Sequence, residues 1–354
     1  MPITDIQQAT PEWLTTVLRN KGCLDQGNVT EVRHISQAAT TSSVCHLALT
    51  YSDAAPESAP SRLFLKILKP EFSSDFGRKE IEFYSNVADA MIDPPVVRCY
   101  DAVYSEETGG AHLLLDDVSE THFTVGNVKS DADTKRYCEQ VMDCLAEFHA
   151  FWWDHPRLGK DIGTLLTEEG LINGIPGTER TVSGFVEYLG DRLSVERRRL
   201  YKKIISAQPA LFKRLTRGKD LTLVHGDAHL WNFLCPGNPN KGKVCIIDWQ
   251  FWHPSIASTD LAFMIALHWC PERRRLLEKD LIERYHNGLL EHGVANYNWD
   301  DCWNDYRLSV IIMDLFVPVW QWSLFGMSED VWWSNLENAM LAFEDLGCAE
   351  LLET

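Results

Sequence analysis

The segment 221–232 combines a β-rich run with polar residues of the kinds that carry out chemistry. It reads Leu-Thr-Leu-Val-His-Gly-Asp-Ala-His-Leu-Trp-Asn, and its apolar start predicts a strand that delivers the polar residues to its carboxyl end. Asp227 and Asn232 have four residues between them. Enzymes that transfer phosphoryl groups place a catalytic base and a magnesium ligand at this spacing. The segment therefore predicts phosphoryl transfer, with Asp227 as the catalytic residue.

A second carboxylate follows on a predicted hairpin. The β-rich stretches 232–235 and 244–248 flank a turn-forming stretch, which predicts antiparallel pairing. If Cys235 pairs with Val244, the same register brings Asp248 beside Trp231 and Asn232. The oxygens of Asn232 and Asp248 are hard ligands, and they suit Mg²⁺, which keeps some of its waters and takes phosphate oxygens to fill its shell. The hairpin therefore predicts a metal site.

Lys66 is the one charged residue between Leu63 and Leu68, in a segment that otherwise reads as a buried strand. An unpaired ammonium there would be costly, so Lys66 needs an anionic partner. The predicted helix over 76–91 offers Glu80, which shares a stripe with Tyr84, while Glu82 falls on the polar side. The periodicity predicts a Lys66–Glu80 ion pair. The alternative, in which both side chains reach solvent, stays open.

The elements around these residues change character along the chain. Strand-like segments dominate the first third, with the helix 76–91 as the exception, and helical periodicity dominates from about residue 131. The arrangement predicts an α+β protein with a β-rich N-terminal part, 1–116, and a mainly helical C-terminal part, 117–354, that contains the hairpin. The predicted strands cover 44–51, 63–68, 96–103 and 112–115, and one predicted helix buries Tyr137, Val141, Leu145, Phe148 and Trp152.

Three of these segments together resemble a known family. His225–Asn232, the Ile-Asp-Trp-Gln run that contains Asp248, and Asp260-Leu-Ala resemble the aminoglycoside phosphotransferase and choline kinase superfamily. The resemblance covers about residues 30–345, and the Asp-Trp-Gln form and the Phe83-Tyr84 pair are similar to its ecdysteroid-kinase-like branch. It implies a two-lobed protein-kinase-like fold, ATP and Mg²⁺ as cofactors, and a small-molecule hydroxyl as the phosphate acceptor.

The resemblance also implies a role for each matching residue. Asp227 would orient or deprotonate the acceptor hydroxyl, and Asn232 and Asp248 would hold magnesium. Asp260 would brace the catalytic loop, although a plain helix-cap carboxylate explains it equally well. A structural or loop-bracing role, rather than metal ligation, is expected for His225, His229 and His149.

The nucleotide is expected against the first part of the chain. The resemblance places Lys66 and Glu80 over the phosphates and the adenine on the backbone at Asp116–Val118. The phosphate loop of these kinases would fall at 37–43, where no glycine is present. Side-chain hydroxyls and backbone amides would replace it, at some cost in how closely the loop approaches phosphate. The hydroxyls are those of Thr41, Ser42 and Ser43, and the choice between ATP and GTP stays open.

Composition narrows the choice of partners. The 354 residues include 51 acidic and 33 basic ones, a net charge of -18 that repels nucleic acids and anionic membranes. The ten cysteines are scattered and the N-terminus lacks a signal segment, so we expect a cytoplasmic protein with reduced thiols. The apolar stretch 310–325 is interrupted by polar residues and predicts a buried helical region rather than a membrane span.

The sequence leaves four questions open. The acidic charge favours a cationic amino-alcohol or aminoglycoside as acceptor, whereas 13 tryptophans favour a flat, hydrophobic, steroid-like alcohol. A protein substrate is disfavoured, because 248–260 contains no long activation loop. A catalytically impaired ligand-binding protein is suggested by the glycine-free loop but disfavoured by intact Lys66, Asp227, Asn232 and Asp248. The oligomeric state is also open.

Overall fold

The chain divides into two compact units, and the division differs from the expected boundary at 116/117. The computed structural model describes residues 1–38, 42–68, 77–127, 131–238 and 242–353. Unit 1 consists of Met1–Asn127 and Asn232–Phe251, and unit 2 of Val128–Trp231 and Trp252–Thr354. The hairpin joins unit 1 because its first strand, β8 (Phe233–Pro236), pairs with β6 (His122–Thr124).

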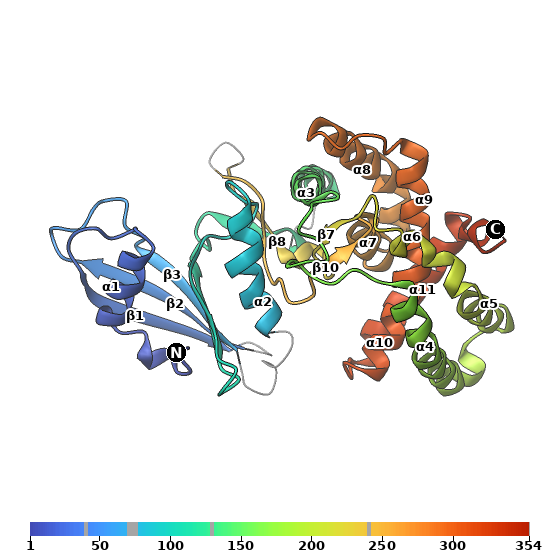
Figure 1. Cartoon of the computed structure of the whole chain (residues 1–354), viewed down its shortest axis with the longest axis horizontal. Helices are drawn as coiled ribbons and strands as arrows, with labels where there is room; N and C mark the ends of the chain where they lie inside the picture. The colour runs from blue at the N-terminus through green and yellow to red at the C-terminus, as the bar shows by residue number, and fades with distance from the viewer. Residues whose placement is uncertain (39–41, 69–76, 128–130, 239–241, 354) are drawn as a thin grey trace. The chain divides into compact units, whose positions relative to one another are not determined.

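Unit 1 is built on a five-stranded antiparallel sheet with the order β1-β2-β3-β5-β4 (Figure 1). Four of its strands occur where the sequence predicts them, whereas β1 was not predicted. The strands are β1 (Val29–Ala38), β2 (Ser42–Tyr51), β3 (Arg62–Leu68), β4 (Cys99–Tyr104) and β5 (Ala111–Asp116).

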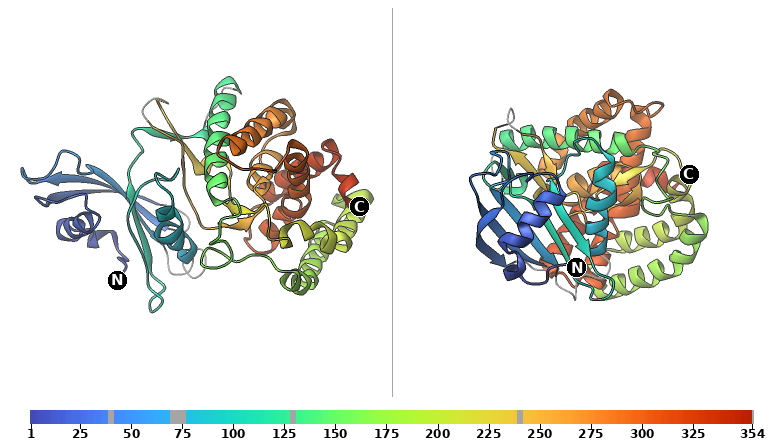
Figure 2. Two further views of the ribbon diagram at one scale, coloured as in Figure 1. Left: turned by 45° about the horizontal axis from the view of Figure 1, so that its top comes forward. Right: turned by 60° about the vertical axis from the view of Figure 1, so that its left-hand side comes forward.

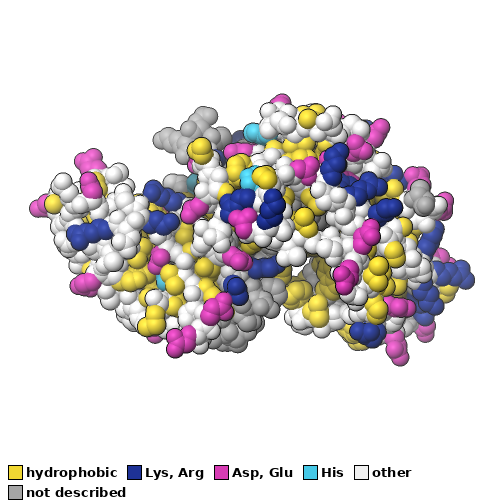
Figure 3. All heavy atoms as spheres, viewed as in Figure 1, with side chains coloured by type: hydrophobic (Ala, Val, Ile, Leu, Met, Phe, Trp, Pro, Cys, Tyr) yellow, Lys and Arg dark blue, Asp and Glu magenta, His cyan; other side chains and the backbone are white. Residues whose placement is uncertain are grey.

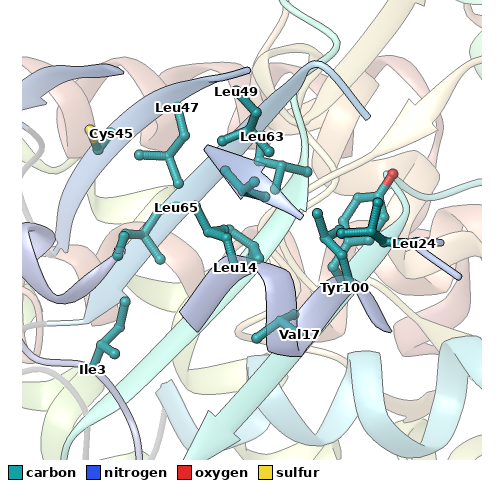
Figure 4. Close-up of a cluster of buried hydrophobic side chains, with 14 of the residues drawn as sticks. Ile3, Leu14, Val17, Leu24, Cys45, Leu47, Leu49, Leu63, Leu65 and Tyr100 are labelled. Carbon is teal, nitrogen blue, oxygen red and sulfur yellow. The ribbon is translucent and has the colours of Figure 1, made fainter. Parts of the chain in front are cut away.

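One face of this sheet is covered by α1 (Pro11–Asn20), which begins after the cap residue Thr10. The Thr10 hydroxyl accepts a hydrogen bond from the backbone N–H of Trp13 at 3.3 Å. Side chains alternate along a strand, so the residues that do not face α1 point to the opposite face. The core against α1 is shown in Figure 4 and includes Leu14, Val17, Leu24, Cys45, Leu47, Leu63, Leu65 and Tyr100.

The opposite face of the sheet carries the second helical segment of unit 1. It comprises α2 (Arg78–Glu82), a π-helical turn η4 (Phe83–Val87) and a 3-10 turn η5 (Ala88–Ala90). The predicted apolar stripe is buried, including Glu80 and Tyr84. Figure 1 shows α1 and α2 on different sides of the strands.

The hairpin formed by residues 232–248 has the predicted register. Phe233 pairs with Ile246 and Leu234 with Cys245, in an antiparallel ladder between β8 and β9 (Cys245–Ile246). The third strand of this small sheet, β6, comes from before the helical region and was not predicted.

Unit 2 is mainly helical and contains one two-stranded sheet, in which β7 (Thr222–Val224) pairs with β10 (His253–Ser255). The long helices α3 and α8 pack against each other (Figure 2), and the predicted face of α3 is buried at Val141, Leu145, Phe148 and Trp152. The helices are α3 (Asp131–Trp152), α4 (Glu168–Leu189), α5 (Val195–Leu211), α6 (Lys213–Thr216), α7 (Ser258–Ala262), α8 (Pro271–Glu291), α9 (Trp299–Ser309), α10 (Val317–Ser323) and α11 (Glu329–Asp345).

The apolar stretch 310–325 forms a π-helical turn, η11 (Val310–Asp314), followed by α10. Most of it is buried, as predicted, although Leu324 and Phe325 at its end are exposed. Among the described helices, none has both the length and the apolarity needed to cross a membrane. On the face drawn in Figure 3, acidic and basic side chains are interspersed.

Candidate functional site

Unit 1 contains a pocket of about 580 Å³ on the sheet face opposite α1. Its apolar wall comes from the sheet and from the hairpin, for example from Val44, Phe64 and Ile247. Six of the residues predicted from the sequence line this pocket. They are Ser42, Lys66, Glu80, Asp116, Val118 and Asp248.

The charged end of the pocket is centred on Lys66, and we call Lys66, Glu80 and Asp248 the ion cluster. The Lys66 Nζ lies 2.9 Å from Oε1 and 2.8 Å from Oε2 of Glu80, which is the predicted ion pair. It also lies 2.6 Å from Oδ1 of Asp248, a contact that was not predicted. One ammonium thus bridges two carboxylates that come from a helix and from the hairpin.

Burial and the neighbouring carboxylates shift the pKa of Lys66 in opposite directions. Burial would lower the pKa of Lys66, but the carboxylates of Glu80 and Asp248 outweigh it and raise that pKa, so Lys66 stays protonated. The Glu80 side chain is 2% exposed, whereas that of Asp248 is 41% exposed. Glu80 therefore holds Lys66 from within the protein, and Asp248 presents its carboxylate to the pocket.

The backbone shape after β9 sets the position of Asp248. The N–H of Ile247 donates to the backbone oxygen of Asn232 at 3.0 Å, which continues the predicted register to the residue before Asp248. Asp248 then adopts a left-handed conformation with φ 69°, which aspartate tolerates better than most residues. Gln250 Nε2 donates to Asp248 Oδ1 at 2.8 Å. The next residue, Trp249, stacks on Phe83 with ring centroids 3.8 Å apart and anchors this turn to η4.

The segment after β5 is fixed by a residue that sequence reasoning missed as a functional candidate. The Asp117 carboxylate accepts hydrogen bonds from Arg62 at 3.0 and 3.1 Å and from the backbone N–H of Ser119 at 3.0 Å, and His46 Nδ1 lies 2.9 Å from it. Burial would raise the pKa of Asp117, but these partners lower it to about 2. The backbone at Asp116–Val118, where the sequence predicts adenine, is thereby held at the pocket edge.

The three residues whose hydroxyls were predicted to form the phosphate loop differ in where the structure places them. Ser42 is buried and lines the pocket with Val44 on the same face of β2. Ser43 alternates to the other face of the strand and does not line the pocket. Thr41 lies outside the described residues.

In unit 2, the loop that carries Asp227 is held by Asp260, on α7. Asp260 Oδ2 accepts from the backbone N–H of His225 at 2.7 Å, and Oδ1 accepts from that of Gly226 at 2.9 Å. Gly226 has φ 79°, a left-handed conformation that favours glycine at this place in the motif. The helix-cap explanation of Asp260 is wrong, because α7 has Ala257 at its N-cap and no side-chain cap.

Two further buried side chains complete what we call the loop support, which consists of Asp260, His149 and Tyr285. His149 Nε2 lies 3.2 Å from Asp260 Oδ2, and its Nδ1 lies 2.8 Å from the Tyr285 hydroxyl. Burial would raise the pKa of Asp260, but the hydrogen bonds and charge of His149, with those of His225, hold it below its usual value. Asp260 is therefore a stable anion that orders the loop.

The histidines of the motif are placed around Asp227 within unit 2. The Asp227 N–H donates to His225 Nδ1 at 3.2 Å, and His229 Nε2 lies 3.6 Å from Asp227 Oδ2. Within the described residues, no three or more His, Cys, Asp or Glu side chains gather in an arrangement that could hold a metal ion. The contacts of His225 and His229 are thus those of loop residues. The chain passes through the 3-10 turn η8 (Leu230–Asn232) into unit 1, where Asn232 is buried.

Comparison with known proteins finds a family that matches the chain and solved structures with a similar fold. Residues 55–297 match the phosphotransferase enzyme family. A search of curated protein sequences finds no significant match. Among solved structures, a protein of Ralstonia eutropha that is provisionally assigned as an aminoglycoside phosphotransferase has a TM-score of 0.58 at 14% identity, covering 96% of this chain and 98% of that one.

Two kinases give similar values. An ethanolamine kinase of Plasmodium vivax has a TM-score of 0.55 at 13% identity, covering 89% of this chain and 84% of that one. A microcompartment-associated aminopropanol kinase has a TM-score of 0.53 at 13% identity, covering 93% and 95%. At these identities the likeness shows the fold, and the predicted α+β protein-kinase-like fold is confirmed.

Proposed function

Because the chain belongs to the phosphotransferase enzyme family, we propose that it transfers the γ-phosphoryl group of ATP to a hydroxyl of a small molecule. The observation that carries the proposal is Lys66, held between Glu80 and Asp248 in a pocket of about 580 Å³. An ammonium has three N–H donors, so a lysine that is held by two carboxylates at a pocket can still donate to a phosphate oxygen. The volume lies in the range of ordinary ligand pockets.

The pocket of unit 1 offers matching surfaces to the two ends of a nucleotide. The base would lie between apolar side chains such as Val44 and Ile247 and would meet the backbone at Asp116–Val118. The phosphates would lie toward Lys66, with the Ser42 hydroxyl at the same wall. One relative of this fold was solved as a GDP complex, the aminoglycoside 2'-phosphotransferase-IIIa, so the use of ATP rather than GTP is part of our proposal.

The donors present in unit 1 also fit magnesium. Asp248 exposes 41% of its side chain in the pocket, and both it and Asn232 offer oxygen, the ligand type that Mg²⁺ prefers. We propose that Asp248 and Asn232 hold the ion. When bound, magnesium would supply positive charge beside the phosphates, in addition to that of Lys66.

Asp227 is proposed as the residue that acts on the acceptor. Its carboxylate accepts a hydrogen bond from the acceptor hydroxyl and takes its proton as the bond from that oxygen to the γ-phosphorus forms. The bond between the γ-phosphorus and the bridging oxygen of ADP breaks in the same displacement. The loop support holds the backbone of His225 and Gly226, directly before Asp227, so positioning contributes a large part of the rate.

Two sets of observations bear on the chemical class of the acceptor alcohol. The relatives named above act, by their names, on aminoglycosides, ethanolamine and aminopropanol. The Asp-Trp-Gln run and the Phe83-Tyr84 pair support instead the ecdysteroid-kinase-like branch and a steroid-like alcohol. In this chain both features have a packing role, because Phe83 stacks on Trp249.

The decisive experiment compares the protein with its Asp227→Asn variant in a phosphate-transfer assay with ATP, Mg²⁺ and a panel of alcohols. We expect turnover to fall by about 1000-fold or more, because Asn cannot take the proton. The melting temperature should stay within a few degrees, since the Asp227 side chain is 27% exposed and Asn is nearly isosteric. Near-normal turnover in the variant would overturn the role of Asp227.

A thermal-shift titration with ATP and Mg²⁺ tests the alternative of a catalytically impaired binding protein. A ligand that binds only the folded state raises its melting temperature. Stabilisation by the nucleotide together with transfer supports the enzyme. Stabilisation without transfer to any alcohol would favour the binding protein.

A further inference from the structure

Unit 2 contains a second pocket, of about 290 Å³, whose walls are formed by α4, the α5–α6 segment, the β10–α7 segment and the η11–α10 segment. Among the described residues that line it there is no Asp, Glu, Lys or Arg. Its surface is largely apolar, with Ile175, Phe316 and Trp320 among its walls. The pocket of unit 1, by contrast, is lined by both members of the Lys66–Glu80 pair and by Asp248.

We propose that the unit 2 pocket holds the phosphate acceptor and that this acceptor is an uncharged, largely apolar alcohol. The inference rests on the proposed function, because it takes the occupant as the nucleophile of the transfer. An ammonium group in this pocket would lose its water and gain no carboxylate in return, which is costly. A ring system or a branched chain would instead gain from burial against the apolar walls.

One polar atom in the pocket is suited to orient such a molecule. Gln208 lines the pocket and is 3% exposed, and its Oε1 has no hydrogen-bond partner in the described part of the structure. A buried carbonyl oxygen without a partner is uncommon in folded proteins and marks a place where a ligand donor can bind. An oxygen acceptor binds a hydroxyl without requiring charge on the ligand.

The pocket is built on the same elements that position Asp227. His253 lines the pocket and pairs with Val224 on β7, and the catalytic Asp227 follows Val224 by three residues. Thr259 also lines the pocket, and its neighbour Asp260 holds the backbone of the loop. A molecule in the pocket therefore lies against the ribbon and the helix that support the catalytic loop.

Room for the ligand comes partly from α4, where Gly170 and Gly174 lie one helical turn apart and both line the pocket. Gly174 lines the pocket and a Cβ built on it has no heavy atom within 4 Å, so we expect a larger side chain at this position to occupy part of the pocket. Gly177 lies on the same helix but does not line the pocket, and a Cβ there meets only an Arg180 nitrogen at 4.0 Å. Gly174 and Gly177 therefore provide a matched pair of positions for substitution, one that lines the pocket and one that does not.

The test measures binding by thermal shift of the full chain without nucleotide, using two alcohols of the same shape. 4-Ethylcyclohexanol is neutral, and 4-(aminomethyl)cyclohexanol carries an ammonium in place of a methyl group. We expect millimolar 4-ethylcyclohexanol to raise the melting temperature of the wild type and of Gly177→Leu. The shift should be lost in Gly174→Leu and reduced at least by half in Gln208→Met. The amine should give a smaller shift than its neutral counterpart.

The outcomes separate this inference from the proposed function. A shift by the neutral alcohol that disappears only in the pocket variants supports the pocket and its selectivity, even if no phosphate is transferred. A larger shift by the amine, an equal shift in Gly174→Leu and Gly177→Leu, or no shift with either alcohol overturns it. Phosphate transfer is measured separately, and transfer only to cationic alcohols, unaffected by Gly174→Leu, would leave the kinase function standing and reject the inference.

Discussion

Both units bury a carboxylate beside a proposed catalytic group, but the two carboxylates have different partners. Glu80 of the ion cluster in unit 1 is paired with the ammonium of Lys66. Asp260 of the loop support in unit 2 is satisfied by two backbone N–H groups and by His149. The first arrangement leaves a cation at a pocket, where it can act on a ligand. The second leaves no charge for a ligand and fixes the shape of a loop.

This contrast predicts that changes in the ion cluster mainly lower activity, whereas changes in the loop support mainly lower stability. Ion pairs at a pocket are formed partly for the ligand, so their net contribution to folding is small. Hydrogen bonds from buried backbone groups to an anion are needed for the fold itself, because their loss leaves donors unsatisfied. Substitutions at four residues test the contrast, and they follow in order of decreasing expected effect.

The largest effect is expected for Asp248→Ala. The change removes the proposed magnesium ligand and one partner of Lys66, so turnover with ATP should fall by about 1000-fold. The free energy of unfolding should change by less than about 1 kcal/mol, because the carboxylate is partly exposed and Lys66 keeps Glu80. Steady-state kinetics and urea unfolding measure the two quantities. A large loss of stability with normal turnover would reverse the assignment.

Asp260→Ala is expected to show the opposite balance. It leaves the N–H groups of His225 and Gly226 and the ring of His149 without their buried acceptor, which costs about 3 kcal/mol or more of stability. The milder Asp260→Asn variant keeps one carbonyl oxygen and should lose less. Urea unfolding of both variants at neutral pH gives the comparison, and a loss below about 1 kcal/mol in Asp260→Ala would contradict the role of the loop support.

The pH dependence of Asp260 follows from the direction of its pKa. The folded protein holds that pKa below its unfolded value of about 3.9, so the stability it contributes is complete above that value and is lost as the pH falls through the folded pKa. The stability difference between wild type and Asp260→Asn should therefore be constant from pH 5 to 8 and shrink below about pH 4. A constant difference down to pH 3 would mean that folding does not lower the pKa of Asp260.

The sequence predicts only part of the ion cluster and of the hairpin beside it. The Lys66–Glu80 pair follows from strand alternation and helical periodicity, and the pairing of Phe233 with Ile246 follows from the turn between two β-rich stretches. Such local patterns indicate which face a residue occupies. They do not identify a distant partner, so the contact of Lys66 with Asp248, 182 residues away in sequence, was missed.

The same limit explains why β6 and β10 were not predicted. β6 and β10 have three residues each, too few for a recognisable alternation, and their partners β8 and β7 lie far away in the sequence. The hairpin was consequently assigned to the helical part. The support of the loop by Tyr285 was also not predicted, because this buried side chain lies on a helix whose apolar face suggests packing alone.

A smaller effect is expected for Glu80→Gln, which tests the inner half of the ion cluster. Gln keeps the shape of the side chain but removes the charge that holds Lys66 from within the protein. We expect kcat/KM for ATP to fall by about 10- to 100-fold, as for other residues that orient a group in direct contact with the ligand. Glu82→Gln, on the more exposed side of the same helix, is the matched control. Equal behaviour of the two variants would remove Glu80 from the site.

The smallest effect concerns a third buried carboxylate, Asp314, for which the described residues provide neither kind of partner. It is fully buried on η11, and neither of its oxygens has a hydrogen-bond partner among the described residues. Burial raises the pKa of Asp314 well above its usual value. The folded protein thus binds a proton that the unfolded chain releases above about pH 4, and this proton stabilises the fold less and less as the pH rises toward the folded pKa.

Asp314→Asn removes this proton uptake while keeping the size of the side chain. Relative to wild type, the variant should gain about 1 kcal/mol of stability between pH 5 and pH 6, since one pH unit corresponds to 1.36 kcal/mol for a full proton. Urea unfolding of both proteins at the two pH values measures the gain, and Asp314 has no contact with either pocket, so turnover should not change. No change in relative stability between these pH values would mean that Asp314 is ionised in the fold and has a partner there. Glu80, Asp260 and Asp314 would then each have a partner, and only the kind of partner would differ.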